Sequence, residues 1–206
     1  MDRQISKTAS VAWAAVFLLV LAWSAVAPHD RFTWWLEALP AMVAFAILAA
    51  TRVRFPLTSL LYVLILLHAI ILMIGAHYTY AEVPLGDWLR SLTGGERNNY
   101  DKLGHFAQGF VPAMVARELL IRWSVVAKRG WLPFIIVCIS LAISAFYELI
   151  EWWAALLSGE GAEAFLGTQG YAWDTQSDML WALSGATLAL VLLSAIHDRQ
   201  LSELES

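Results

Sequence analysis

Six apolar segments alternate with short polar stretches along this chain of 206 residues. Each is long enough, or nearly so, to cross about 30 Å of hydrocarbon as a helix. The pattern therefore predicts an all-α fold, a polytopic transmembrane helix bundle of about six spans. We expect the spans near residues 10–27, 35–50, 57–76, 103–121, 131–153 and 178–196.

The first segment has features of a signal peptide, with basic residues before it and small residues after it. It is long for that role, and we expect it to stay in the protein as a span. One integral membrane domain then covers residues 1–206. Basic residues indicate its orientation, because lysine and arginine favour cytoplasmic loops. One side holds Arg3, Lys7, Arg52, Arg54, Arg122, Lys128, Arg129 and Arg199, against Arg31, Arg90 and Arg97 on the other, so both termini should be cytoplasmic.

Composition supports a membrane protein and excludes several other classes. The chain is 60% hydrophobic and contains 11 tryptophans, too much apolar surface for an ordinary soluble domain. Its net charge is −4 and it has no basic tract suited to nucleic acid. Cys138 is the only cysteine, which excludes an intramolecular disulfide and any CxxC motif. A metal would have to be held by histidines and carboxylates.

The segment 131–153 carries Glu148 and Glu151 near its end, next to Tyr147. An acid at the centre of a membrane helix costs about 2.5–3.5 kcal/mol, less toward the ends. Acids persist there mostly when they are paired, bound to a metal or facing a wet cavity. These two carboxylates therefore predict partners elsewhere in the chain.

Two other segments offer such partners at the same depth. Asp101 and His105 are four residues apart at the start of one span, and Asp174 and Asp178 repeat that spacing at the start of another. In the expected topology, all of them lie with Glu148 beneath the outer, periplasmic surface. This convergence predicts a metal site with His105, Glu148, Asp178 and Asp174 as ligands and His77 as a second imidazole.

The oxygen-rich ligand set suits Zn²⁺, Mg²⁺, Mn²⁺ or Fe²⁺, and we expect no organic cofactor. Glu151 would act as the general base for an activated water, and Asp101 would orient ligands or bind a second ion. Structural roles compete with these. Asp101 and Asp174 could cap their helices, His105 could be a structural histidine, and Lys102 and Arg97 could neutralise the acids in place of a metal. His68 has no acidic neighbour in sequence and is expected to be structural.

Several motifs stand out, namely the run from Asn99 to Phe110, the Tyr147–Trp153 segment, Gly167-Thr168-Gln169-Gly170, and His77-Tyr78-Thr79-Tyr80-Ala81-Glu82-Val83-Pro84. With these motifs the chain resembles the YjdF family of bacterial inner-membrane proteins. The chain is also distantly similar to VanZ-like membrane proteins. The resemblance implies a multi-pass protein of the bacterial inner membrane. Tyr171 stands where family members often carry an acid, which removes one ligand from the acidic, glycine-rich loop 154–174.

Three functions are compatible with this pattern. The first is a metal-dependent hydrolase or transferase acting on a lipid or lipid-linked substrate. The second is a non-catalytic membrane partner or assembly factor whose acids form structural ion pairs, and the third is a proton-coupled transporter. Membrane lipids are the expected partners, nucleic acid is not, and a homo-oligomer is an alternative to the monomer.

Overall fold

The computed structural model describes residues 6–158 and 169–205, and this part of the chain contains helices and no strands. The long helices follow the apolar segments because their backbone groups can all be paired within one segment. The α-helices are α1 (Lys7–Ser24), α2 (Arg31–Thr51), α3 (Ser59–Tyr78), α4 (Pro84–Thr93), α5 (Tyr100–Arg122), α6 (Leu132–Ser158) and α8 (Asp174–Glu205). Two short 3₁₀ turns, η1 (Tyr80–Glu82) and η2 (Arg129–Trp131), precede α4 and α6.

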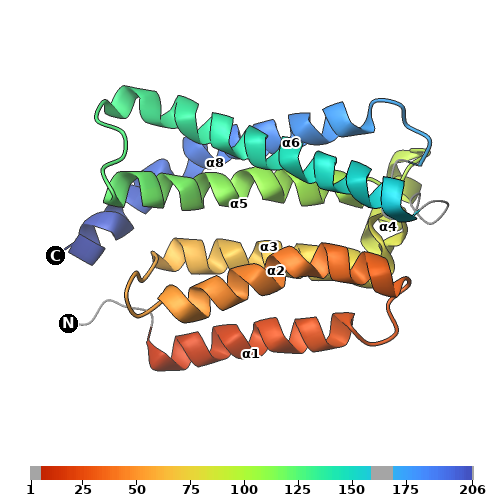
Figure 1. Cartoon of the computed structure of the whole chain (residues 1–206), viewed down its shortest axis with the longest axis horizontal. Helices are drawn as coiled ribbons and strands as arrows, with labels where there is room; N and C mark the ends of the chain where they lie inside the picture. Colours follow the sequence, from red (N-terminus) through yellow and green to blue (C-terminus); the bar gives the residue numbers. More distant parts are fainter. Residues whose placement is uncertain (1–5, 159–168, 206) are drawn as a thin grey trace.

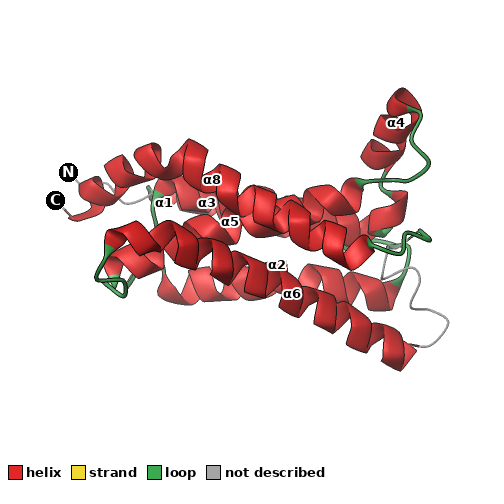
Figure 2. Ribbon diagram, turned by 90° about the horizontal axis from the view of Figure 1, so that it is seen from above, coloured by secondary structure: helices red, strands yellow, loops and turns green. Residues whose placement is uncertain are grey.

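Six of these helices run side by side and form a bundle (Figure 1). Helices α1, α2 and α3 form one layer and α5, α6 and α8 the other, with α3 packed against α5 between them. The start of α1 and the end of α8 lie at the same end of the bundle. The short helix α4 lies at the opposite end and projects from it (Figure 2).

Five helices are long and apolar enough to cross a membrane, namely α1, α2, α3, the segment containing α6, and α8. The predicted span at 103–121 corresponds to α5, which is of similar length but much more polar. Its charged residues are Asp101, Lys102, Arg117, Glu118 and Arg122. All of these except Arg122 are buried against neighbouring helices. The expected all-helical bundle is thus confirmed, with five apolar helices of membrane-spanning length and one more polar helix packed among them.

Helix ends differ from the predicted spans by a few residues. Helix α1 ends at Ser24, before the predicted end at residue 27, because Ala27 adopts a positive φ of 46° and Pro28 follows it. Helix α8 begins earlier than predicted, at Asp174, and continues to Glu205. Polar residues can extend a membrane helix beyond the hydrocarbon, so hydropathy alone underestimates its length.

Helices α5 and α8 make the most extensive contact in the bundle. Gly109 of α5 lies against the backbone of Ala182, and Gly185 of α8 lies against the backbone of Phe106. A Cβ atom at either glycine would overlap the opposing main chain. Small residues at a crossing allow membrane helices to approach closely, and here they bring the first turns of α5 and α8 together.

The outer surface of the long helices is apolar. Leu19 of α1 and Val191 of α8 are 70% and 73% exposed, and many other large hydrophobic side chains are also uncovered. A surface of this kind is unfavourable in water but matches the hydrocarbon of a bilayer. The arrangement therefore positions the buried polar residues inside a bundle whose exterior suits lipid.

Candidate functional site

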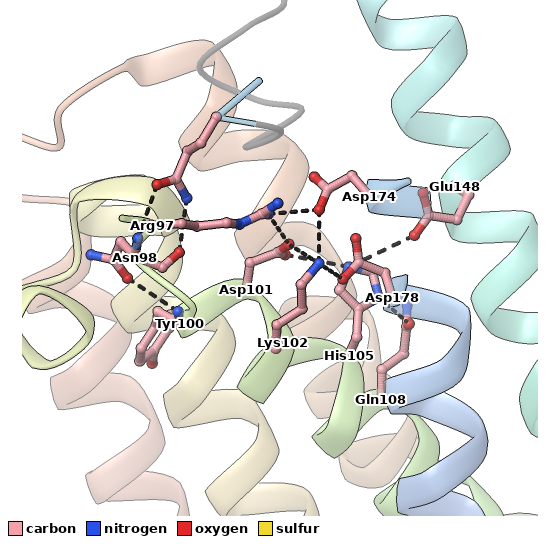
Figure 3. Close-up of polar contacts among 11 residues, drawn as sticks. Arg97, Asn98, Tyr100, Asp101, Lys102, His105, Gln108, Glu148, Asp174 and Asp178 are labelled. Atoms are coloured by element: carbon pink, nitrogen blue, oxygen red, sulfur yellow. Dashed lines mark hydrogen bonds and ion pairs between the residues drawn. The ribbon is translucent and has the colours of Figure 1, made fainter. Parts of the chain in front are cut away.

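The acids and the histidine predicted at the starts of two helices do meet in space (Figure 3). Asp101 and His105 lie one turn apart on the same face of α5, because a spacing of four residues keeps side chains on one face. Asp174 and Asp178 occupy the same relation in α8. The close crossing of these two helices turns both faces toward each other, and all four residues are buried.

Two cations hold the carboxylates of α8. Lys102 donates hydrogen bonds from Nζ to Oδ1 of Asp174 at 2.7 Å and to Oδ1 of Asp178 at 2.5 Å. Arg97 reaches the same Asp174 oxygen at 2.6 Å and lies 3.6 Å from Asp101. Charge-assisted bonds of this length are strong when buried. The predicted alternative, in which these cations neutralise the acids, therefore describes Asp174 well.

Arg97 is positioned by a clamp between two loops. Gln169 accepts a hydrogen bond from the backbone N–H of Asn98 at 3.0 Å and donates one to the Asn98 carbonyl at 2.8 Å. The Asn98 side chain, fully buried, donates to the Val83 carbonyl and to Asp87. The Gln169 motif noted in the sequence thus fixes the loop that carries Arg97.

His105 faces two carboxylates. Its Nε2 lies 3.3 Å from Oδ1 of Asp101 and 3.8 Å from Oε1 of Glu148, while Nδ1 lies 3.1 Å from the side-chain oxygen of Gln108. Asp101, His105 and Asp178 each offer one ligand atom, and these atoms all lie within 4.8 Å of one another. Three of the predicted site residues therefore form a group that could hold a metal ion.

A cavity of about 200 Å³ lies beside this group, between α2, α3, α5 and α6. Asp101 and His105 form one wall, and Glu151, predicted as the general base, lines it from α6. Tyr80 of η1 also lines the cavity, with its ring packed against Gly75 and Gly104. Burial raises the pKa of Tyr80 well above its usual value, so its phenol remains protonated and able to donate a hydrogen bond.

The remaining predicted residues have different outcomes. Glu148 is near His105, but it lies outside the group of three whose ligand atoms are within 4.8 Å. His77 does not join the cluster, because its Nδ1 contacts the Ser24 carbonyl at 3.2 Å and its ring lies 4.5 Å from that of Trp23. Its role as a second imidazole is thus not supported by its position. Glu160 and Glu163 of the acidic loop lie outside the described residues.

The sequence interpretation missed Glu37, which lines the cavity together with His68. Glu37 lies inside the predicted span 35–50, and an acid in a membrane helix needs a partner there, as Glu148 does. The sequence predicts a structural role for His68, because no acidic residue is near it along the chain. In space it shares a cavity with Glu37, Asp101 and Glu151, which belong to three other helices.

A second buried polar cluster lies at the other end of α5 and was not predicted. Glu118 accepts hydrogen bonds from Thr58 Oγ1 at 2.8 Å, from His197 Nε2 at 2.9 Å and from Arg122 at 2.9 Å. Arg117 donates to His197 Nδ1 at 2.8 Å. Since the donors and acceptors are matched, this cluster joins α3, α5 and α8 and has the properties of a structural clamp.

An all-helical bundle with five apolar helices of membrane-spanning length defines a multi-pass membrane protein. Residues 9–199 match the family described as "Predicted membrane protein (DUF2238)", and the chain belongs to this family. It is 54% identical over 188 residues to the inner membrane protein YjdF of Escherichia coli (strain K12), covering 91% of this chain and 90% of that relative. No solved structure matches the chain.

These findings confirm the predicted resemblance to the YjdF family and the localisation as a multi-pass protein of the bacterial inner membrane. The more distant similarity to VanZ-like proteins stays a prediction. Neither the family description nor the name of the relative states a reaction, so any function has to be argued from the site itself.

Proposed function

We propose that this protein is a metal-dependent membrane enzyme, a hydrolase or transferase that acts on a lipid or lipid-linked substrate. Asp101, His105 and Asp178 would hold one divalent ion, Zn²⁺, Mg²⁺, Mn²⁺ or Fe²⁺. The observation that carries the proposal is that their three ligand atoms lie within 4.8 Å of one another in a buried site. One imidazole and two carboxylates form a donor set that these ions accept.

The hydrogen bond of His105 supports this ligand role. When Nδ1–H donates to Gln108, the lone pair of Nε2 points toward Asp101 and Glu148. An imidazole lone pair and two carboxylate oxygens repel one another unless a cation or a proton lies between them. A divalent ion held by Asp101, His105 and Asp178 would relieve this repulsion, and the residues present therefore fit a metal.

A bound divalent ion would supply a Lewis acid that activates water or polarises a substrate oxygen. The other predicted roles fall to residues of this chain. Glu151, in the cavity next to Asp101 and His105, would accept the proton of the attacking water. Lys102 would keep Asp178 oriented, and Asp174 would anchor Lys102 and Arg97 instead of binding the metal.

The same proposal includes the topology. Helix α5 would cross the membrane inside the bundle as a sixth span, shielded from lipid by its neighbours. The loops at the end of the bundle that holds the start of α1 contain Arg52, Arg54, Lys128 and Arg129, and we propose that this end faces the cytoplasm. The cluster around His105 would then lie on the periplasmic side.

Elemental analysis of the purified protein tests the metal site. We expect about one divalent ion per chain in the wild type and loss of the ion in His105→Ala and Asp178→Asn. Asp198→Asn is the matched control, because Asp198 lies on the same helix α8 but pairs with Arg117 at the other end of the bundle. A wild type that stays free of metal after incubation with each ion would overturn the proposal.

One observation favours a second candidate, the non-catalytic membrane partner. The bonds of Lys102 to Asp174 and Asp178 already neutralise part of the acidic cluster without a metal. If the cluster were only structural, Asp178→Asn would lower stability while the wild type bound no ion. The same elemental analysis, combined with thermal unfolding, distinguishes the two functions.

A further inference from the structure

The cavity between α2, α3, α5 and α6 has a feature that a metal at Asp101, His105 and Asp178 does not explain. Its wall opposite α5 carries the acid Glu37 from α2 and the imidazole of His68 from α3. Glu37 is only 2% exposed, and its Oε2 accepts no hydrogen bond. The Nε2 atom of His68 is also buried without a partner.

Unsatisfied buried polar atoms are rare in native proteins and commonly mark a place where something else binds. Glu37 and Glu151 both line the cavity and make no ion pair with a lysine or arginine among the described residues. By contrast, Asp101 has Arg97, Lys102 and His105 near it. Glu37 and Glu151 are therefore the acids of the cavity that have no lysine or arginine partner among the described residues.

No lysine or arginine is present among the residues that line this cavity within the described chain. A phosphate or carboxylate in it would face three acids, Glu37, Asp101 and Glu151, with only the imidazoles of His68 and His105 to oppose them. A cationic group would instead meet carboxylate oxygens and the aromatic rings of Tyr80 and Tyr147. Charge complementarity therefore favours a cation over an anion.

We propose that this cavity binds the protonated amine of a small aminoalkyl group, held between Glu37 and one oxygen of Glu151, whose other oxygen stays available as the general base. An ammonium has three donors and one charge, which suits two carboxylates and the free Nε2 of His68. The volume of about 200 Å³ equals about seven water molecules at ~30 Å³ each, so a head of a few heavy atoms fits and an acyl chain does not.

This inference rests on the proposed enzyme and names its substrate class, a lipid with an amine in its headgroup. The amine in the cavity would lie next to Asp101 and His105, which line the same space. The bond to be cleaved or formed would then be close to the metal ligands, and the apolar tail would remain in the surrounding bilayer.

The test is thermal unfolding of the purified full-length protein at neutral pH with ethanolamine as the probe. Ethylene glycol is the neutral control of similar size, and sodium chloride matches the ionic strength. We expect a saturable rise in Tm with ethanolamine alone. Glu37→Gln and Glu151→Gln should each weaken this response by on the order of tenfold or more.

Glu82→Gln is the matched control, because Glu82 lies at the same end of the molecule but is exposed beside His29. It should respond as the wild type does. Equal stabilisation by ethylene glycol, or unchanged responses in Glu37→Gln and Glu151→Gln, would overturn the proposal. If a variant fails to fold, the comparison of ethanolamine with ethylene glycol on the wild type still tests whether the protein binds an amine.

Metal content separates this inference from the proposed enzyme. Asp178→Asn should lose the ion and keep the response to ethanolamine, because Asp178 does not line the cavity, whereas Glu37→Gln should keep the ion and lose the response. A wild type that binds ethanolamine but no metal would overturn the enzyme and leave an amine-binding membrane protein. A wild type that binds metal but not ethanolamine would overturn the amine site alone.

Discussion

At the scale of single residues, many polar side chains lie either in buried clusters or at helix ends. Asp30 lies at a helix end, where it caps α2 by accepting a hydrogen bond from the backbone N–H of Thr33 at 2.7 Å. This bond to the backbone is the main reason that the pKa of Asp30 is lowered from its usual value of 3.8.

Asp30→Ala should lower the free energy of unfolding by about 1 kcal/mol at neutral pH, because the cap is lost. A group whose pKa is lower in the folded state stabilises while it is ionised. Its contribution is complete above the usual pKa of 3.8 and is lost as the pH falls through the lowered value. Thermal unfolding of both proteins across acidic pH measures this, and a difference that grows toward low pH would contradict it.

Glu118→Ala should have a larger effect. Glu118 is fully buried, and its removal leaves His197 and Arg122 without their acceptor. Breaking a buried ion pair on one side costs about 3–5 kcal/mol. Unfolding in mixed micelles measures the loss. Asp198→Ala is the control, because its side chain is 59% exposed and its pair with Arg117 should contribute about 1 kcal/mol or less.

At the scale of elements, the crossing of α5 and α8 decides whether the site assembles. Asp101 and His105 come from one helix and Asp178 from the other, so their distance depends on how closely the two backbones approach. Gly109 and Gly185 allow that approach. The packing of these helices is thus a condition for the metal site.

Gly109→Ala should push the helices apart, because the new methyl group would overlap the carbonyl of Ala182. Overpacking of this kind costs about 1–3 kcal/mol, against a gain in helix propensity of up to about 1 kcal/mol. We expect lower thermal stability and weaker metal binding. Gly130→Ala is the control, since a Cβ there meets no atom within 4 Å. If both variants had the same stability and metal affinity, the close crossing of α5 and α8 would not be a condition for the metal site.

At the scale of the whole molecule, the even number of long helices brings the start of α1 and the end of α8 to one end of the bundle. The loop with α4 and the acidic cluster are at the other end (Figures 1 and 3). Membrane orientation then determines which compartment reaches the site.

Cysteine labelling tests this orientation. In a Cys138→Ser background, Ser91→Cys of α4 should react with a membrane-impermeant maleimide in spheroplasts, because Ser91 is exposed at the proposed periplasmic end. Ser202→Cys, exposed near the end of α8, should react only after the membrane is permeabilised. The reverse pattern would place the site on the cytoplasmic side.

Local sequence patterns determined the class of fold and part of the site. Apolar segments of membrane-spanning length predict helices directly, because backbone groups in lipid must be paired within a segment. The spacing of four predicts that Asp101 and His105 share a face, since helical geometry alone decides it. These features need no knowledge of how the helices pack.

Only the tertiary structure decided which side chains meet. Lys102 reaches Asp174 and Asp178 across the α5–α8 crossing, while His77 turns to Ser24 instead of the cluster. Glu37 and His68 join the cavity from helices whose rotation the sequence does not reveal. The physical reason is that apolar helices can rotate and shift against one another with little change in hydropathy. Close packing of small residues such as Gly109 and Gly185 selects one arrangement and so brings particular charges together.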